Sequence, residues 1–221
     1  MKKQNLFIIL LLVSTISLAQ VDTKFGIRGG VSIAGMRGES VNSLQNLLDY
    51  SNGMVTTNDR TGFYGGGYVS IPVANIISIE PALYYSQKGY NMVGELNIKG
   101  AEFIGANAKA KLNISYIDLP IVVKANISGL QMFAGPQISY LIQADLKTTA
   151  GLFGINLFNR TMDASDQFNK WDAGFTGGIG YQFSNGLNIT AAYDHGLAKA
   201  DADQSSNTYN RSFKVGLGMS F

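Results

Sequence analysis

The residues that could perform catalysis centre on His195, the single histidine, which follows Asp194 in the stretch Tyr193-Asp-His-Gly196. A histidine oriented by a carboxylate can act as the general base of a hydrolase. Adjacent residues of a β-strand point to opposite faces, however, so Asp194 cannot orient His195 within a strand. No Gly-x-Ser-x-Gly motif supplies a nucleophilic serine. The sequence therefore predicts no catalytic residue, and we expect that the protein is not an enzyme.

Metal and cofactor chemistry has equally little support in this chain. Asp201 and Asp203 could approach a cation, but they lack the Gly and Glu that complete a calcium-binding loop. The glycine-rich runs 26–30 and 174–180 are not followed by a helix whose N-terminus could bind phosphate. Without cysteine there is no disulfide, Cys-ligated zinc or thiol nucleophile. We expect no metal site and no cofactor, and a net charge of only +2 without a dense basic run predicts no nucleic-acid partner.

Five charged residues form the most informative polar set, because each falls in an alternation phase that otherwise holds mostly glycine, tyrosine and polar side chains. They are Arg28, Glu80, Asp118, Asp194 and Lys214. If this phase faces the inside of an eight-stranded barrel, which side chains alone can fill, the charges are buried and must pair. Two interpretations follow. The set is either a salt-bridged plug that holds the barrel closed or a gated path for ions or protons.

The elements that must carry these residues are β-strands, and the last twelve residues show the pattern most clearly. Every second position from Phe213 to Phe221 is large and apolar, whereas the positions between them are Gly, Ser and Lys214. Side chains alternate across a strand, so one face of this segment is apolar and the other is small or polar. A strand with lipid outside and a narrow filled lumen inside has this pattern.

Seven more segments follow the same rule and have the length of about 9 to 11 residues, or slightly more, that a tilted membrane strand needs. The sequence therefore predicts an all-β fold, an eight-stranded antiparallel transmembrane β-barrel with long extracellular loops. Pro81 lacks a backbone donor, which predicts a bulge or an unpaired slot in the third strand. The predicted strands are 24–33, 62–71, 76–89, 110–124, 130–142, 171–183, 187–197 and 210–221.

The connections alternate between short and long, which assigns the two ends of the barrel. Short turns at 72–75, 125–129 and 184–186 belong on the periplasmic side, and long loops belong outside. The first long connection predicts a short surface helix at 41–50, and the third holds 151–158, which could prolong a hairpin beyond the membrane. The outward aromatic residues then form two girdles. They are Phe63, Tyr85, Tyr140, Trp171 and Phe213 at the outer rim, and Phe25, Tyr181, Phe183 and Phe221 at the inner rim.

The fourth predicted strand changes phase along its length. Leu112, Ile114 and Tyr116 fit one outward register, whereas the apolar residues of 117–123 fit the other. One extra residue in a strand reverses the faces of everything beyond it. We therefore expect a β-bulge near residues 115–117, with Leu112, Ile114 and Tyr116 facing outward.

The N-terminus and the composition agree with an exported membrane protein. A basic start, an apolar run and the small-x-small site at residues 17–19 predict a secretory signal peptide over residues 1–19 and a barrel domain over 20–221. Charged residues make up 14% of the chain, below the roughly 25% of soluble domains. No later segment is apolar for the roughly 18 residues that a spanning helix needs. A closed barrel satisfies its backbone groups in lipid without such helices.

Five stretches carry a family resemblance: residues 79–89 (IEPALYYSQKG), 116–124 (YIDLPIVVK), 134–136 (AGP), 177–180 (GGIG) and the terminal Phe221. Together they resemble the PorT-like outer-membrane β-barrel family, often labelled the porin family. The resemblance covers nearly all of the chain beyond residue 19 and implies a small outer-membrane barrel of a Gram-negative bacterium. It also implies that Phe221 is an assembly signal, read by the barrel-assembly machinery through the C-terminal strand. No motif here carries the namesake's part in protein secretion.

These observations favour a structural or surface-interaction role for a barrel whose lumen is plugged by inward polar and charged side chains. A narrow porin-like channel for small solutes or ions is the alternative, and a soluble lipocalin-like barrel with an apolar ligand is a third reading. The expected partners are outer-membrane lipid, the barrel-assembly machinery and an extracellular ligand at the long loops, which sit on a rigid frame.

Overall fold

The computed structural model describes residues 22–38, 55–96, 106–152, 155–203 and 207–221. This part of the chain forms nine β-strands and one short 3-10 helix, η1 (Ser165–Gln167). The predicted signal peptide and the predicted helix at 41–50 lie outside the described residues. The strands are β1 (Lys24–Gly38), β2 (Val55–Pro72), β3 (Ile77–Leu96), β4 (Ala106–Ile127), β5 (Leu130–Leu152), β6 (Ile155–Asp163), β7 (Trp171–Gln182), β8 (Leu187–Gly196) and β9 (Thr208–Ser220).

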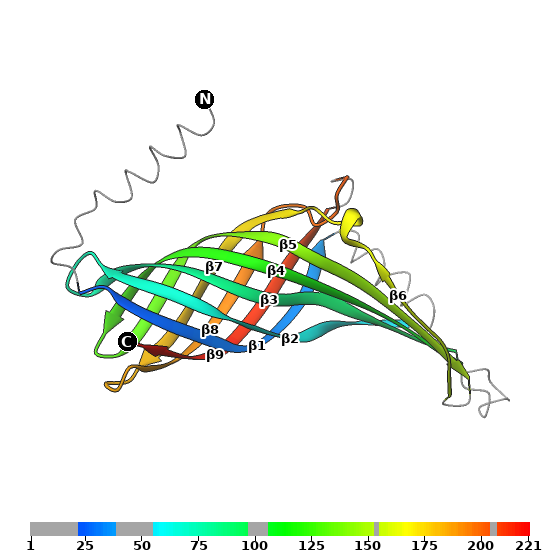
Figure 1. The fold of residues 1–221 in the computed structure, drawn as a ribbon, viewed down its shortest axis with the longest axis horizontal. Coiled ribbons are helices and arrows are strands. Elements are labelled where there is room, and N and C mark those ends of the chain that lie inside the picture. Colours follow the sequence, from blue (N-terminus) through cyan, green and yellow to red (C-terminus); the bar gives the residue numbers. More distant parts are fainter. Residues whose placement is uncertain (1–21, 39–54, 97–105, 153–154, 204–206) are drawn as a thin grey trace.

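Eight of these strands close into a ring in the order β1-β2-β3-β4-β5-β7-β8-β9 (Figure 1). Every pairing is antiparallel, and β9 closes the ring by pairing with β1 from Gly26↔Ser220 to Gly38↔Thr208. β6 stands outside the ring and pairs with β5. The predicted fold class, an eight-stranded antiparallel barrel, is confirmed.

The two faces of the ring have the chemistry that the alternation predicts. Along β9, Val215, Leu217 and Met219 lie on the exterior, and Leu217 is 57% exposed, whereas Lys214 is 5% exposed in the interior. On the other ring strands most large aliphatic residues are likewise exposed and most charged residues buried, while several tyrosines and a group of apolar residues on β4 and β5 also face inward. An exterior of this kind suits a hydrocarbon environment rather than water.

Aromatic side chains meet on the exterior at both ends of the ring. The Tyr140 and Trp171 rings pack edge to face with centroids 4.9 Å apart, and Phe63 lies 5.7 Å from Tyr85. At the end with the short turns, Tyr181 packs edge to face on Phe183 at 5.0 Å. These contacts place the predicted outer and inner aromatic girdles at opposite ends of the barrel wall.

Each proline inside a strand interrupts one ladder without shifting its register. Pro81 lies in the gap of the β2–β3 ladder between Tyr68↔Ala82 and Ile71↔Ile79. Pro120 and Pro136 lie in equivalent two-residue gaps of the β3–β4 and β4–β5 ladders. Proline has no N–H to donate, so the pairing opens locally and resumes in register. The unpaired slot predicted at Pro81 is confirmed.

The phase change predicted for the fourth strand is wrong. β4 keeps one phase, and Leu112, Ile114 and Tyr116 point into the barrel with exposures of 5%, 0% and 1%. A register shift does occur at this height, between Ser115↔Gln143 and Tyr116↔Leu141, but the extra residue is Ile142 on β5. In chain order, the inward residues of β4 are apolar from Leu112 to Tyr116 and include the charged Asp118 and Lys124 after that. The predicted phase change came from this change in composition, because the strand itself does not change face.

β2 to β5 continue past the ring on the side opposite the short turns and form, with β6, the projecting sheet (Figure 1). Its β3–β4 pairs run to Leu96↔Ala106, and β6 pairs with β5 from Asp145↔Asp163 to Leu152↔Ile155. The predicted prolongation of a hairpin at 151–158 is confirmed. The predicted long connections were too long, because β2 to β5 extend several residues further than the alternation indicated.

The hairpins at the short-turn end are closed by tight backbone geometry. Ser128 and Gly129 both have positive φ angles, of 51° and 92°, and the Asn126 side chain accepts a hydrogen bond from the Gly129 N–H at 3.1 Å. Gly186 (φ 90°) closes the β7–β8 turn by donating its N–H to the Phe183 carbonyl. Positive φ suits Gly and short polar side chains, so the turns predicted at 125–129 and 184–186 are confirmed.

Candidate functional site

The lumen nearer the short turns is crossed by an inner tier of charges, Arg28, Glu80 and Lys124. Arg28 Nη1 donates to Glu80 Oε1 at 2.9 Å and to the Tyr84 hydroxyl at 3.0 Å. Lys124 pairs with the other carboxylate oxygen, Glu80 Oε2. All three charged side chains are less than 10% exposed. Two cations from opposite sides thus satisfy both oxygens of one buried carboxylate.

Further from the short turns lies an outer tier, formed by Lys88, Asp118, Asp194 and Lys214. Asp118 is fully buried and accepts from Lys88 Nζ at 3.2 Å and from Lys214 Nζ at 3.1 Å. Lys214 also lies 2.6 Å from Asp194 Oδ2. Each cation here reaches a carboxylate on another strand, so the outer tier ties β3, β4, β8 and β9 together.

Tyrosine rings fill the space around the tiers. Arg28 stacks on the Tyr68 ring at 4.4 Å from its centroid, and Lys214 Nζ lies 5.3 Å from that of Tyr64. Glycines opposite these rings make the room: a Cβ at Gly26 would overlap the Tyr68 ring, and one at Gly216 would overlap the Tyr64 hydroxyl. Inward glycines therefore set how closely the aromatic and cationic side chains pack.

An apolar cluster caps the outer tier. Its buried members, contributed by β4 and β5, are Leu112, Ile114, Tyr116, Leu141 and Ala144. Met36, Tyr90 and Phe168 pack against them from β1, β3 and the segment after η1. This cluster stands where the projecting sheet leaves the ring, so polar and apolar layers succeed one another along the lumen.

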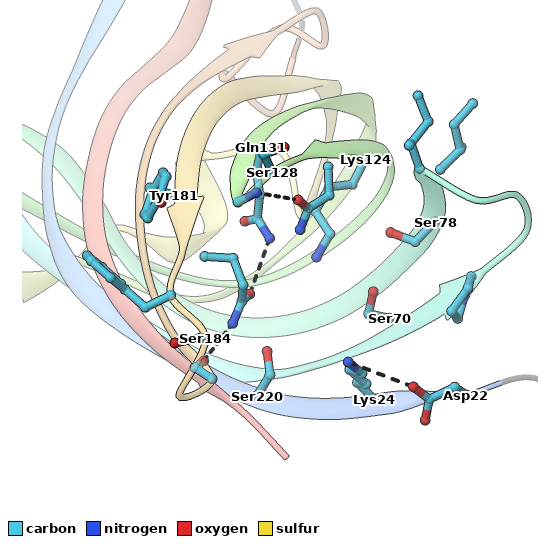
Figure 2. Close-up of a pocket in the computed structure, with 18 of the residues that line it drawn as sticks. Asp22, Lys24, Ser70, Ser78, Lys124, Ser128, Gln131, Tyr181, Ser184 and Ser220 are labelled. Atoms are coloured by element: carbon cyan, nitrogen blue, oxygen red, sulfur yellow. Dashed lines mark hydrogen bonds and ion pairs between the residues drawn. The ribbon is translucent and has the colours of Figure 1, made fainter.

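A large cavity opens only part of the way into the lumen from the short-turn end. This vestibule has a volume of about 970 Å³, and Figure 2 shows Lys124 and Gln131 among the side chains around it, with Ser70, Ser78 and Ser220 on its wall. Beyond it the cavities shrink to about 40 Å³ beside both tiers and about 10 Å³ beside Asp172. The first volume exceeds that of several waters, whereas the last holds at most one.

The structure places all five predicted charges in the lumen but divides them between two levels. Arg28 pairs in register with Gly218, and Lys214 with Ser32, so the two cations are four residues apart along the β1–β9 ladder. Sequence reasoning missed Lys88 and Lys124 as members of the set. Both share the inward phase of their strands, so following the alternation to the strand ends would have found them.

The other candidate residues do not converge on a reactive centre. Asp194 is buried in the lumen, whereas His195 Nε2 lies 2.7 Å from an Arg37 nitrogen and its ring lies beside Tyr193 on the exterior. The terminal Phe221 is 72% exposed, and its N–H donates to the Phe25 carbonyl at 2.7 Å. Its role as an assembly signal stays a prediction.

Among the described residues, no group of three or more His, Cys, Asp or Glu side chains is arranged to hold a metal ion. None of the helices in the described segments has the length and apolar character required for crossing a membrane.

Comparison with known proteins gives one family match and several similar structures. The family model for the outer membrane protein beta-barrel domain matches residues 18–202. No curated protein matches the chain. Neisserial surface protein A is 12% identical, with a TM-score of 0.47, 89% of this chain and 97% of that chain covered. The attachment invasion locus protein Ail of Yersinia pestis is 12% identical, with a TM-score of 0.45 and coverages of 90% and 98%.

Proposed function

Because the chain belongs to the outer membrane beta-barrel family, and therefore lies in the bacterial outer membrane, we propose that it is a sealed barrel with a structural or surface-interaction role. The lumen serves to hold the barrel closed, and the projecting sheet presents surface outside the membrane. The sealed, rigid ring acts as a scaffold that holds the projecting sheet in place.

One observation carries this proposal: charged side chains bridge the lumen at two levels. Glu80 holds Arg28 and Lys124 in the inner tier, and Asp118 holds Lys88 and Lys214 in the outer tier. A carboxylate and its cations buried together leave no solvated charge to guide a passing ion. The apolar cluster above adds a layer that water wets poorly.

The projecting sheet supports the surface-interaction part of the proposal. β6 has a free edge, since among the described strands it pairs with β5 alone, and its residues 158–163 are exposed. Phe158 and Met162 are 48% and 46% exposed there. Exposed strand edges and apolar side chains are features that partner molecules use.

Planar-bilayer recording of the refolded protein tests the sealed lumen. We expect no steady conductance from the wild-type barrel once its insertion is established by protease protection in the same lipid. Glu80→Ala and Arg28→Ala should lower the stability of the barrel while leaving the bilayer silent. Stable stepwise currents from the wild type would overturn the proposal.

A narrow channel for small solutes or ions is the second candidate, and the vestibule favours it. This cavity of about 970 Å³ already opens the short-turn half of the lumen as far as Lys124 and Gln131. Conduction would then require the side chains of the two tiers and of the apolar cluster beyond them to move out of the way. In that case Glu80→Ala, which releases Arg28 and Lys124, would raise the current instead of leaving it at zero.

We also infer that the protein has no catalytic role. His195 and Asp194 lie on different faces of β8, and the buried carboxylates of the two tiers are occupied by lysine and arginine. A general acid or base must reach a substrate, which these groups do not. Loss of a measurable hydrolase activity on replacing His195 would contradict this.

A further inference from the structure

Three lysines lie together on the outward face of the projecting sheet, away from both charge tiers of the lumen. Lys111 on β4 stands directly opposite Lys147 on β5, and Lys109 stands opposite Thr149. Cross-strand partners share a face of the sheet, so the three ammonium groups form one basic patch. Lys109 and Lys111 are exposed, and none of the three forms an ion pair with another described residue.

Along their own two rows, the neighbours of these lysines add hydrogen-bonding groups but no acid. The row of Lys111 and Lys147 continues to Asn91 on β3 and Thr161 on β6. The row of Lys109 continues through Thr149 to Asn159. The basic patch therefore comprises Asn91, Lys109, Lys111, Lys147, Thr149, Asn159 and Thr161. Its donors suit a ligand that bears several anionic oxygens.

The nearest carboxylates lie one row away on either side, with Asp145 and Asp163 in the row toward the ring and Glu95, opposite Asn107, in the row away from it. Asp145 accepts from Gln143 Nε2 at 2.8 Å, and Asp163 accepts from the Ser165 N–H at 2.8 Å. Lysines placed directly opposite one another repel, which makes the sheet less stable unless an anion lies between them. The arrangement is therefore one that a bound anion would stabilise.

The direction of this face identifies where the anion comes from. β4 keeps one phase, so Lys109 and Lys111 point the same way as Ile121 and Val123, which are exposed on the apolar exterior of the ring. Lys111 lies six residues beyond Ile117, the partner of the girdle residue Tyr140. At about 3.3 Å per residue, this is roughly 20 Å along a tilted strand. The basic patch thus lies beyond the outer girdle on the face that continues the lipid-facing wall, at the level of large headgroups.

We propose that the basic patch binds the phosphate groups of the phosphorylated saccharide headgroups carried by outer-leaflet glycolipid. Lys111 and Lys147 hold one phosphate between them, and Lys109 neutralises a further charge on the same headgroup. The threonine and asparagine side chains donate to phosphate or sugar oxygens. This binding anchors the projecting sheet to the outer leaflet that surrounds the ring.

Binding of glycolipid to the full barrel tests this proposal. The protein is refolded in detergent and titrated with purified phosphorylated glycolipid or with the same lipid after enzymatic removal of phosphate, and bound lipid is counted by native mass spectrometry. We expect the wild type to bind the phosphorylated form at least tenfold more tightly. The double substitution Lys111→Glu and Lys147→Glu should weaken this binding roughly tenfold or more, because each lysine near an anionic surface contributes about 1 kcal/mol.

Lys24→Glu is the matched control, because Lys24 is an exposed lysine at the opposite end of the barrel. It should bind the phosphorylated lipid as the wild type does. Equal affinity of the double variant and the wild type, or equal affinity for the two lipid forms, would overturn the proposal. Binding that a soluble sulfated polysaccharide reproduces with the same dependence on Lys111, while glycolipid does not bind, would also overturn it.

Discussion

Lys214 on β9 contacts Asp118 on β4, and these two strands stand four places apart in both directions around the eight-stranded ring. The side chains of Lys214 and Asp118 therefore span the full width of the lumen between them, and they meet at a distance of 3.1 Å from Nζ to Oδ2. Lys88 and Ser86 contact the same carboxylate, the latter through a 2.7 Å hydrogen bond. Asp118 is accordingly the residue on which the outer tier depends.

Replacing Asp118 by Asn should lower the free energy of unfolding by about 3 to 5 kcal/mol, because two buried ammonium groups lose their shared partner. Urea unfolding in lipid vesicles, followed by the fluorescence of Trp171, measures this. Asp59→Asn is the control, since Asp59 pairs with Arg211 at 3.1 Å and both side chains are over 40% exposed. Its effect should stay below about 1 kcal/mol. Equal losses from the two variants would mean that the outer tier does not stabilise the barrel.

Gly216→Ala should destabilise the barrel by roughly 1 to 3 kcal/mol, because a methyl group there overlaps the Tyr64 hydroxyl inside the packed lumen. Gly65→Ala tests the same chemical change where there is space, since its Cβ would lie 3.7 Å from the nearest atom, the Arg28 carbonyl oxygen. Denaturant midpoints of the two variants against wild type give the comparison. A harmless Gly216→Ala would show that Tyr64 is not held against β9.

Trp171, the single tryptophan, should report the outer boundary of the membrane. It is 59% exposed on the exterior and packs on Tyr140. Amphipathic rings prefer the headgroup boundary, so lipids brominated near the headgroup should quench its fluorescence more than lipids brominated at the chain end. Quenching by aqueous iodide without any quenching by brominated lipid would place Trp171 outside the bilayer.

Alternation predicted the ring because lipid and lumen demand opposite chemistry at successive residues. It worked best for β9, where Val215 and Leu217 alternate with Lys214, Gly216 and Gly218. It also placed Glu80 and Asp118 on the inward face. It could not reveal which cation meets which carboxylate, since contacts such as Lys214 with Asp118 depend on ring closure and stagger rather than on local pattern.

The pattern failed on β4 because the environment changes along the strand. Beyond the girdle the exterior is no longer lipid, so Lys109 and Lys111 occupy outward positions while Leu112 and Ile114 fill the interior. The apolar phase therefore switches faces although the strand does not. The extra residue at Ile142 is on β5, where a single shift in register gives little signal in the sequence.

Ile114→Ala tests this corrected placement. Ile114 is fully buried in the apolar cluster, so its truncation should lower the free energy of unfolding by about 2 to 4 kcal/mol. Ile121→Ala is the control, because Ile121 is 52% exposed on the exterior, where lipid chains fill the space left by the lost atoms. Unfolding in vesicles compares the two. A larger loss of unfolding free energy from Ile121→Ala than from Ile114→Ala would indicate that Ile114 lies on the exterior instead.

The orientation of β9 is the most direct test of a barrel with lipid outside and a packed lumen inside, and the absence of native cysteine makes the measurement clean. Single cysteines at Leu217 and Gly218 are spin-labelled after refolding into vesicles, and collision with oxygen is compared with collision with an aqueous nickel complex. With β9 in this orientation, oxygen in the hydrocarbon reaches the label at Leu217 and nickel does not. A cysteine at Gly218, beside Asn188 in the lumen, reacts poorly with the spin label or carries a label that oxygen does not reach. A label at Leu217 that nickel reaches and oxygen does not would contradict this orientation.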